Sequence, residues 1–387
     1  MQFQKTLITI AAAFAFGAAS PTLFAAPITT EGVGVGKHGD IRVAVTFDNG
    51  KIQKIDILKN AENPVLAKKV FTDLKDQVAA ANSVQVDIVS GATFTSKGML
   101  DAIEDAAKKA GVTLGKADKK ALKAAVKDLP KNASYDVVVI GAGGAGFSAA
   151  IEAKNAGANV VLLEKMPQVG GNSLISGAEM NAAKNWVQPK LGITDDSPEL
   201  HAKDTYLGGD KKGDMNVINV MTHNALAGAE WCRDYLGIRF EPDNLFFFGG
   251  HSRKRALIPV GHTGTEFITK FQAKADELGI PVITNMKAEE LIKDKSSRVV
   301  GVKATMNGAE YTFNAKGGVV LATGGFGANP AMVKKYNPKI DERFKTTDAP
   351  GTTGEALYMA QRAGAELVNM QYIQTYPICD PISGVIE

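Results

Sequence analysis

Cysteine is nearly absent from this chain. Its 387 residues include two cysteines, Cys232 and Cys379, which lie far apart in the sequence. Such a pair does not build a disulfide framework, and without a C-x-x-C-H motif there is no attachment site for a c-type haem. Five histidines occur without the spacing of zinc ligands, so we expect no metal site.

An excess of charge of one sign is also lacking. The 44 basic and 41 acidic residues leave a formal net charge of +3. So even a balance argues against nucleic acid, or an acidic membrane surface, as a partner. A chain of 387 residues that is 45% hydrophobic is long enough for two or three domains with their own cores. Forty glycines stand out, and several form pairs where backbone must approach another group closely.

Residues 1–26 are typical of a secretory signal peptide. Lys5 supplies a positive charge, residues 6–19 are apolar, and small residues precede Pro27. The alternatives are a short buried helix or a membrane anchor, but the apolar run is short for a membrane span. Because there is no twin-arginine motif, we expect export by the general secretory (Sec) route and a periplasmic location.

Residues 30–112 predict a small α+β unit. Two alternating strands flank Asp48-Asn49-Gly50, which is a strong hairpin turn. The expected elements are strands over Ile41–Phe47 and Ile52–Leu58, a helix over Pro64–Ala81, a strand over Val84–Val89 and a helix from about Lys97 to Ala110. Residues 113–133, rich in lysine and alanine, predict a solvated helical linker, with a basic docking patch as the alternative.

From residue 134 to residue 387 the pattern becomes α/β. A strand over Asp136–Ile140, which we expect to be fully buried, leads through glycines into an alanine-rich helix that ends near Ala156. A second buried strand covers Val160–Glu164. Further on we expect a helix over Thr265–Leu278, a strand over Ile280–Thr284, a hairpin over Val299–Ala315 and a buried strand over Gly318–Ala322. This alternation favours a Rossmann-like domain.

The turn after the first of these strands carries a dinucleotide-binding motif. Gly141, Gly143 and Gly146, with Ala145 between the last two, satisfy G-x-G-x-x-G between a strand and a helix. In such a motif the first glycine makes the turn, the second admits a pyrophosphate, and the third lets the helix pack on the strand. Glu164, at the end of the next strand, is placed to accept hydrogen bonds from an adenosine ribose.

Two further glycine clusters favour FAD over NAD. The segment Gly170-Gly171-Asn172-Ser173 follows Glu164 closely, which indicates that the backbone keeps lining an extended cofactor. Thr323-Gly324-Gly325 ends a late buried strand, where the chain returns to the same cofactor. We therefore predict non-covalently bound FAD.

Residues 87–96 contain a second flavin motif. On the residues alone, a glycine-alanine turn before a helix is ordinary, and Thr95 or Ser96 could cap that helix. However, Asp87-Ile-Val-Ser90-Gly91-Ala92-Thr93 resembles the D-x-x-[ST]-G-A-T motif of exported FMN-binding domains. That resemblance implies FMN held covalently on Thr93 by a phosphodiester bond, and a flavin transferase that attaches it. FMN would then pass electrons to FAD.

From Tyr135 onward the sequence resembles the flavoprotein of soluble fumarate reductases, the flavocytochrome c group. The motifs that carry the resemblance are the Gly141–Gly146 loop, Glu164-Lys165, Gly170–Ser173, Gly249-Gly250-His251-Ser252, Ala322–Phe326 and Met370–Gln374. The family fold implies a mobile cap over the FAD domain, with an enoate substrate held between the two. It also places Gly177, Ala178, Ala288 and Asp348 at the FAD. The proton-donating arginine of the family is expected beyond Glu387, so we expect the chain to be a fragment without a visible catalytic residue.

Three departures from the fumarate-reductase pattern change the expected substrate. Tyr376 stands where the family has a carboxylate-binding histidine, Glu179 replaces a glycine, and Phe247 and Phe248 replace methionines. A dianion would be repelled by Glu179, whereas a planar, partly cationic ring on an acrylate would be attracted. The changes resemble those of the urocanate-reducing branch, with Glu179, Phe248 and Tyr376 binding the ring.

Alternatives remain for each of these residues. Tyr376 and Phe248 could pack locally, and Glu179 could pair with a nearby lysine. The resemblance implies anaerobic reduction of urocanate to imidazolepropionate, with electrons from a membrane quinol-oxidising donor. Reduction of fumarate, cinnamate or another 2-enoate is the alternative activity. The alternative class is a flavin electron carrier without turnover.

Overall fold

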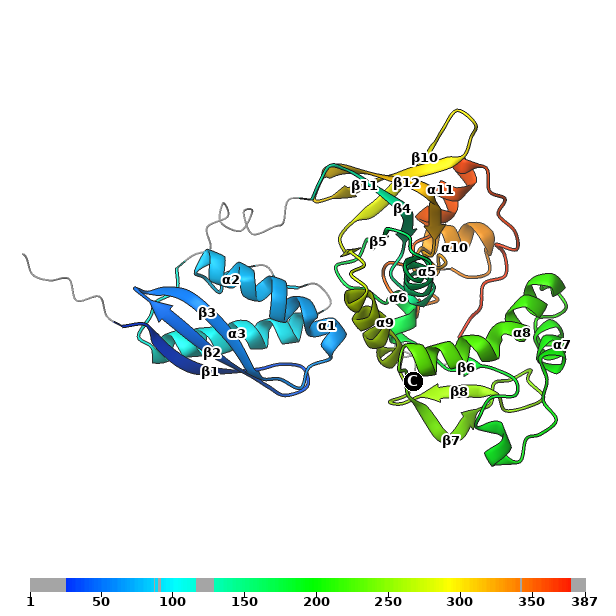
Figure 1. Cartoon of the computed structure of the whole chain (residues 1–387), viewed down its shortest axis with the longest axis horizontal. Helices are drawn as coiled ribbons and strands as arrows, with labels where there is room; N and C mark the ends of the chain where they lie inside the picture. Colours follow the sequence, from blue (N-terminus) through cyan, green and yellow to red (C-terminus); the bar gives the residue numbers. More distant parts are fainter. Residues whose placement is uncertain (1–25, 87, 90–91, 116–128, 342, 377–387) are drawn as a thin grey trace, which may run out of the picture.

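The structure is a computed structural model that describes residues 26–86, 88–89, 92–115, 129–341 and 343–376. The predicted signal peptide and most of the predicted linker lie outside these ranges. An N-terminal α+β unit and a larger α/β unit with a small third sheet follow one another along the chain (Figure 1). In the described ranges, no helix is both long and apolar enough to cross a membrane.

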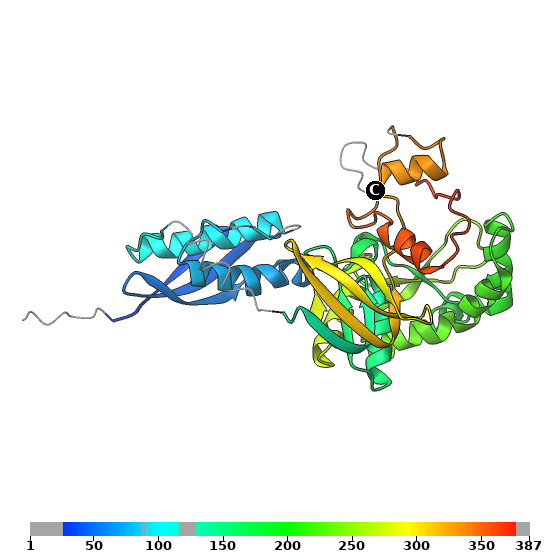
Figure 2. The ribbon, with the colours of Figure 1, turned by 90° about the horizontal axis from the view of Figure 1, so that it is seen from above.

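The first unit is a three-stranded antiparallel sheet, in the order β1-β2-β3, with helices packed on one face (Figure 2). Its elements are β1 (Ile28–Val35), β2 (Asp40–Asp48), β3 (Lys51–Lys59), α1 (Pro64–Lys69), a π-helical turn (Val70–Leu74), α2 (Lys75–Ala81) and α3 (Thr93–Lys109). Alternate residues of β2, including Val43 and Val45, are fully buried against Leu74, Met99 and Ile103 of the helices. The unit therefore has a hydrophobic core of its own.

The predicted hairpin between β2 and β3 is confirmed. The sequence analysis did not predict the strand β1. Asn49 and Gly50 both have positive φ, 49° and 74°, as the predicted turn requires. Gly32 and Gly34 weaken the strand signal of β1. A Cβ on Gly34 would lie 1.9 Å from the carbonyl oxygen of Gly98, and a Cβ on Gly32 equally close to that of Ala102. Both glycines are needed because α3 packs directly on the backbone of β1.

Two other expectations for this unit need correction. The described residues of 84–89 form no strand, and Val84, Val86 and Val89 instead pack against the hydrophobic core of this unit. The last helix begins at Thr93, four residues before the expected Lys97. The helical run over Pro64–Ala81 is confirmed, with a π-helical turn in its middle.

The second unit contains a six-stranded sheet in the order β10-β11-β12-β4-β5-β9. Strands β12, β4, β5 and β9 are parallel, and β10 and β11 extend the sheet antiparallel. The core on one face contains residues of α5 and α9, and the core on the other contains Met359 of α11. The elements are β4 (Asn132–Ile140), α5 (Gly144–Asn155), β5 (Val160–Leu163), α6 (Gly171–Ile175), α9 (Thr265–Glu277), β9 (Val282–Ile283), β10 (Lys287–Lys293), β11 (Val299–Met306), β12 (Ala309–Leu321), α10 (Pro330–Tyr336) and α11 (Glu355–Ala363).

The predicted order of this unit is correct, but three strands differ in extent. β4 begins at Asn132, inside the predicted linker, and only its last three residues are buried, so the expectation of full burial is wrong. The predicted hairpin strand and the strand over Gly318–Ala322 are one strand, β12, with a bulge between Ala315 and Gly318. β9 has two residues instead of five, because it pairs with β5 only at Val282 and Ile283.

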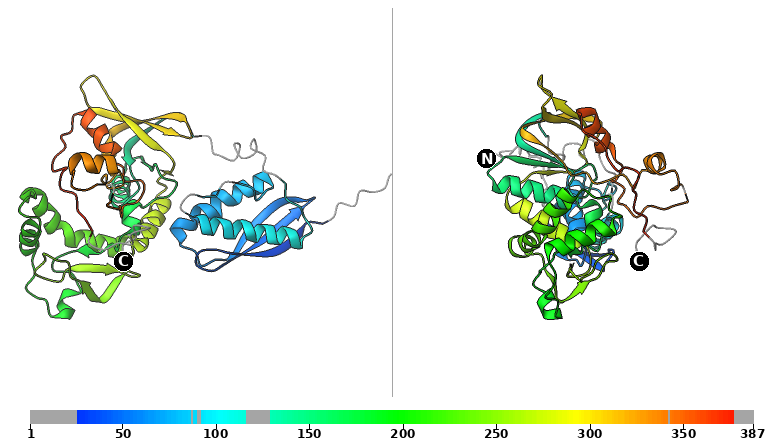
Figure 3. Two further views of the ribbon diagram at one scale, coloured as in Figure 1. Left: turned by 180° about the vertical axis from the view of Figure 1, so that it is seen from behind. Right: turned by 90° about the vertical axis from the view of Figure 1, so that its right-hand side faces the viewer.

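A third, three-stranded sheet in the order β6-β8-β7 lies in the middle of the chain. Figure 3 shows α7, beside this layer, at the side of the molecule away from the first unit. The elements of this middle region are β6 (Met180–Asn181), a 3-10 turn (Gln188–Leu191), α7 (Pro198–Gly208), α8 (Met215–Glu230), a π-helical turn (Trp231–Tyr235), β7 (Phe240–Phe246) and β8 (Ala256–Pro259). The sequence pattern did not predict this third sheet, and only the structure shows it.

Candidate functional site

The glycine-rich turn joins β4 to α5 at the C-terminal edge of the parallel strands. Gly141 has φ +101°, and a Cβ there would lie 2.4 Å from the carbonyl oxygen of Ala322, at the end of β12. A Cβ on Gly146 would lie 1.8 Å from the carbonyl oxygen of Gly141. The first and third glycines of the motif are therefore required by backbone packing, as the motif predicts.

Glu164 is fixed at the same edge by two backbone donors. Its carboxylate accepts hydrogen bonds from the N–H of Ala142, at 2.9 Å, and of Met166, at 2.8 Å. Its side chain is almost fully buried. This geometry orients the carboxylate beside the glycine-rich turn, where its remaining lone pairs can accept from a ribose hydroxyl.

Asn172 connects the second glycine cluster to a distant loop. Its amide nitrogen donates to the carboxylate of Asp348, and its amide oxygen accepts from the N–H of Ala349 at 2.6 Å. Gly327 is required by the same contact, because a Cβ there would lie 1.7 Å from an oxygen of Asp348. Nearby, the hydroxyl of Ser173 accepts from the N–H of Gly144 at 3.1 Å. Two predicted FAD residues, Asn172 and Asp348, are thus joined to each other.

A dinucleotide fits this edge only if the backbone of the three glycine clusters has free space beside it. The glycine positions show that it does. A Cβ built on Gly171, Gly324 or Gly325 would meet nothing within 4 Å. On Gly143 it would meet only Ser173 and Gly170, at 3.6 and 3.7 Å, and Ala145 is exposed. The open side lies at the N-terminus of α5, whose N–H groups and dipole favour phosphate. These residues fit the pyrophosphate of FAD.

The remaining predicted FAD residues lie around this edge. Thr323 follows β12, and Ala288 lies in β10, two residues after Met286, whose N–H donates to the carbonyl of Glu164. Gly177 and Ala178 follow α6, and Ala178 has φ +56°, an unusual conformation for alanine. Contact of any of these residues with FAD stays a prediction.

Thr93 is the first residue of α3, and the free N–H groups at the start of a helix favour a phosphate. The residue before it, Ala92, has no side chain that could cap the helix, and the first turn has no acidic residue. Neither Thr95 nor Ser96 caps α3, because Thr95 donates to Glu62 and Ser96 accepts from the N–H of Val89 at 3.1 Å. Capping by these residues, the ordinary explanation of the motif, is therefore wrong.

Glu179 stands between Ala178 and β6 and is half-buried. Its carboxylate oxygens lie 2.5 Å from a Cβ built on Gly177, so the carboxylate folds back over that glycine. Across the described ranges, no hydrogen bond or ion pair holds it, and the alternative of a lysine partner is not supported. A partly buried carboxylate without a partner is costly, which favours a role in binding.

Phe248 and Tyr376 are not brought to Glu179 by any contact among the described residues. Phe248 follows β7 and packs on Phe246, with ring centroids 4.7 Å apart, and more loosely on His251 at 6.4 Å. Glu179 precedes β6, on the opposite edge of the same sheet. Tyr376 lies after α11 and is 47% exposed.

An ion network under the Phe248 loop was missed by the sequence analysis. Arg255, fully buried, donates to both oxygens of Asp196, at 2.8 and 3.0 Å, and to Asp204 at 2.8 Å. Asp204 also accepts from the N–H and hydroxyl of Ser252, at 2.9 and 2.8 Å. The network therefore fixes the loop over 247–252 on α7. The sequence feature that could have predicted this network is the position of Arg255 directly before the apolar run Ala256–Ile258.

Two histidines beside this network are held neutral. Burial, with the charge of Arg255, lowers the pKa of His201 to about 4. The same two causes lower the pKa of His251. Arg255 lies 2.8 Å from Nδ1 of His251, and because a guanidinium only donates, His251 carries its proton on Nε2. The Nδ1 atom of His201 is buried without a partner.

Family models match both flavin units. Residues 136–384 match the FAD binding domain and residues 36–108 the FMN-binding domain. Urocanate reductase of Eggerthella lenta is 42% identical over 360 residues, which are 92% of this chain and 59% of that protein. NADH:acrylate oxidoreductase of Vibrio harveyi is 32% identical over 419 residues, covering 91% of this chain and 41% of that protein. The chain thus spans about half the length of these curated relatives.

A solved structure supports the same assignment. The open conformation of a flavocytochrome c3 fumarate reductase has a TM-score of 0.58 and 32% sequence identity, over 65% of this chain and 44% of that chain. With the two family matches, this gives the chain FAD and FMN as cofactors and confirms the predicted α/β fold with a separate FMN-binding domain. The chain belongs to the FAD-binding family of fumarate reductase-like flavoproteins.

Proposed function

We propose that the protein is an exported, periplasmic flavin-dependent reductase of conjugated enoates, with urocanate as its substrate. Its FMN would be attached to Thr93 by a flavin transferase and would relay electrons from a membrane quinol-oxidising donor to FAD. The names of the relatives, a urocanate reductase and an acrylate oxidoreductase, support reduction of an alkene next to a carboxylate. Bound FAD would supply a hydride to one carbon of this alkene, and a proton added to the other carbon would complete the saturation.

The observation that carries the choice of urocanate is the carboxylate of Glu179, which has no hydrogen-bond or ion-pair partner among the residues that the structure describes. It lies against Gly177, and only a few residues separate it from Gly171 and Asn172 at the dinucleotide site. A carboxylate there would accept a hydrogen bond from an imidazole N–H and would favour the protonated ring. The same charge would repel the second carboxylate of fumarate.

Phe248 and Tyr376 would complete the recognition of the ring. Phe248 offers an aromatic face on a loop that Arg255 and Asp204 hold in place. Tyr376 offers a hydroxyl from a segment that is accessible to solvent. Among the described residues no hydrogen bond, ion pair or ring contact joins these three side chains, and we propose that substrate binding brings them together.

The test uses the full-length protein, flavinylated and assayed without oxygen, with reduced viologen as the electron donor. Urocanate, cinnamate and fumarate are compared as substrates. We expect turnover with urocanate to exceed that with the other two. Faster turnover with fumarate would contradict the substrate assignment, and no turnover with any enoate would favour an electron carrier.

The variant Glu179→Gln isolates the proposed contact. It should raise the KM for urocanate by roughly tenfold to a hundredfold, the range for losing a hydrogen bond to a charged group, while the KM for cinnamate changes little. Glu310→Gln, at an exposed position near the start of β12, is the matched control. An equal loss with both substrates would assign Glu179 a structural role.

A further inference from the structure

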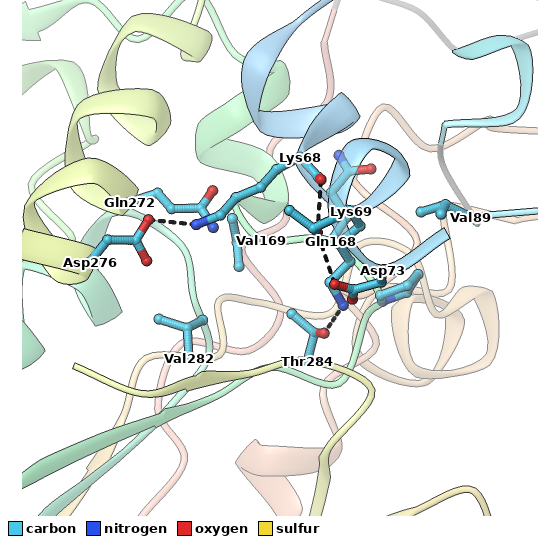
Figure 4. Close-up of a pocket in the computed structure, with 12 residues that line it drawn as sticks. Lys68, Lys69, Asp73, Val89, Gln168, Val169, Gln272, Asp276, Val282 and Thr284 are labelled. Carbon is cyan, nitrogen blue, oxygen red and sulfur yellow. Dashed lines mark hydrogen bonds and ion pairs between the residues drawn. The ribbon is translucent and has the colours of Figure 1, made fainter. Parts of the chain in front are cut away.

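A cavity of about 250 Å³ lies between the FMN-binding unit and the FAD-binding unit (Figure 4). One wall comes from the end of α1, the π-helical turn after it, and Val89. The other comes from the loop after Glu164, from α9 and from the end of β9. The lining residues are Lys68, Lys69, Thr72, Asp73, Val89, Pro167, Gln168, Val169, Gln272, Asp276, Val282 and Thr284.

The two lysines of this cavity differ in their partners. Lys68 forms an ion pair with Asp276 of α9 at 2.5 Å, and both side chains are partly exposed. Lys69 donates only to the neutral hydroxyl of Thr284. Within the described ranges, no carboxylate lies at ion-pair distance from Lys69, and burial lowers its pKa, with Asp73 as a weaker opposing charge. Lys69 is thus a cation withdrawn from water without a matching anion.

The cavity adjoins the turn from which FMN would extend. Val89, in its wall, donates its N–H to the hydroxyl of Ser96 at 3.1 Å, and this bond ties Val89 to the first turn of α3. Thr93 is the first residue of that helix. A group attached to Thr93 therefore starts a few residues from the wall of the cavity.

The lining chemistry matches one part of a flavin. Val89, Val169 and Val282 offer apolar surface to a benzenoid ring, and Lys69 and Gln168 offer donors to carbonyl oxygens. The volume of about 250 Å³ lies just below the usual range for ligand sites, so the cavity suits a ring system better than a whole dinucleotide.

We propose that this cavity binds the isoalloxazine ring of the FMN carried by Thr93, with Lys69 donating to its pyrimidine carbonyls. This rests on the proposed attachment of FMN to Thr93. The opposite wall, Pro167–Val169, is the stretch between Glu164 and Gly170 of the FAD site. A ring bound in the cavity thus contacts the FAD-binding unit directly, and Lys69 links docking of the two units to the presence of the flavin.

The test measures how accessible the FMN ring is to iodide, an ionic quencher of flavin fluorescence, in the complete flavinylated protein. Mass spectrometry first establishes that FMN is attached, and Thr93→Ala protein supplies the FAD background. In Lys69→Met, the ratio of protected to accessible ring should fall about tenfold, as expected for losing a charge-assisted hydrogen bond. Lys59→Met, at the exposed end of β3, is the control that should leave quenching unchanged.

A second variant guards against a folding defect in Lys69→Met. Thr284→Val keeps the charge and removes the hydroxyl that holds it, and quenching should rise by a smaller factor. Equal quenching of the parent, Lys69→Met and Thr284→Val proteins would overturn the proposal. Free FMN can also be added to the Thr93→Ala protein. If this FMN is protected from iodide and the protection requires Lys69, the cavity binds a diffusible flavin instead, which would overturn the proposal. Absence of the FMN mass would overturn the attachment to Thr93, which is a separate failure.

Discussion

Asn172 and Asp348, 176 residues apart in the sequence, hydrogen-bond to each other through their side chains beside the dinucleotide site. The amide of Asn172 also accepts from the N–H of Ala349, so one side chain holds the loop after α10 against the start of α6. Gly327 leaves room for Asp348 in this arrangement. These hydrogen bonds therefore join the loop to the second glycine cluster along one edge of the predicted FAD site.

Asn172→Ala should weaken FAD binding. The substitution leaves Asp348 and the N–H of Ala349 without their partner, so the loop loses its preferred position. We expect the dissociation constant of FAD to rise by roughly tenfold to a hundredfold, measured by titrating the apoprotein and following flavin fluorescence. Asn224→Ala, whose side chain bonds only to its own helix, should bind FAD normally. Unchanged affinity in Asn172→Ala would separate this pair from the cofactor site.

Arg255→Met should destabilise the fold far more than Arg253→Met. Arg255 and Asp196 are both fully buried, so removing the arginine leaves two carboxylates, Asp196 and Asp204, unpaired in the interior. We expect the free energy of unfolding to fall by about 3–5 kcal/mol, measured by chemical denaturation. Arg253 pairs with Asp195 at the surface, where ion pairs contribute little, so its loss should change stability slightly. Similar losses in both variants would contradict the buried network.

Stability should fall as the pH falls from 7 to 5, in part through His201. Burial, with the charge of Arg255, lowers the pKa of His201 from 6.5 to about 4 in the folded state. Between those values the unfolded chain binds more protons, so acid favours unfolding, and stability is retained above the unfolded pKa. This one group should account for roughly 2 kcal/mol of the loss at pH 5.

His201→Phe tests this assignment. Removing the titrating group should make the fall in unfolding free energy between pH 7 and pH 5 shallower, as measured by denaturation at both values. His262→Phe, at a side chain that is 62% exposed, should keep the parent slope. If His201→Phe also keeps the parent slope, other groups cause the acid sensitivity.

Gly34→Ala should destabilise the FMN-binding unit. Its Cβ would lie 1.9 Å from the carbonyl oxygen of Gly98 on α3, so helix and strand must separate. Overpacking of this kind costs about 1–3 kcal/mol, which thermal unfolding of the protein would detect. Gly115→Ala meets no atom within 4 Å and should be neutral. An unaltered transition in Gly34→Ala would mean that α3 does not pack on β1 as described.

The sequence predicted elements that depend on nearby residues. The Asn49-Gly50 turn and the strand–turn–helix around Gly141 each follow from local patterns and from glycine's freedom to adopt positive φ. The expectation that Gly141–Gly146, Glu164 and Thr323–Gly325 share one edge also follows, because parallel strands end at the same side of a sheet. Whether these residues bind FAD stays a prediction.

Local patterns failed where packing between distant segments decides the structure. The sequence of β1 does not predict a strand because it contains glycines. These glycines are required because α3, a helix more than sixty residues later, packs directly on the backbone of β1. The valines of 84–89 alternate as a strand would, yet they pack against the core of the unit without pairing as a strand. Similarly, nothing near Glu179 in the sequence indicates that its carboxylate lacks a partner in the part of the chain that the structure describes.

By itself, the sequence determined the order of the two flavin units, the glycine-rich turn and the acidic residue that faces it, since backbone conformation there is set within a few residues. Only the tertiary structure decided the Asn172–Asp348 bond, the burial of Arg255 between Asp196 and Asp204, and the cavity beside Lys69. Each of these joins segments far apart in the chain. Their charges and hydrogen bonds become strong only after folding removes water from around them.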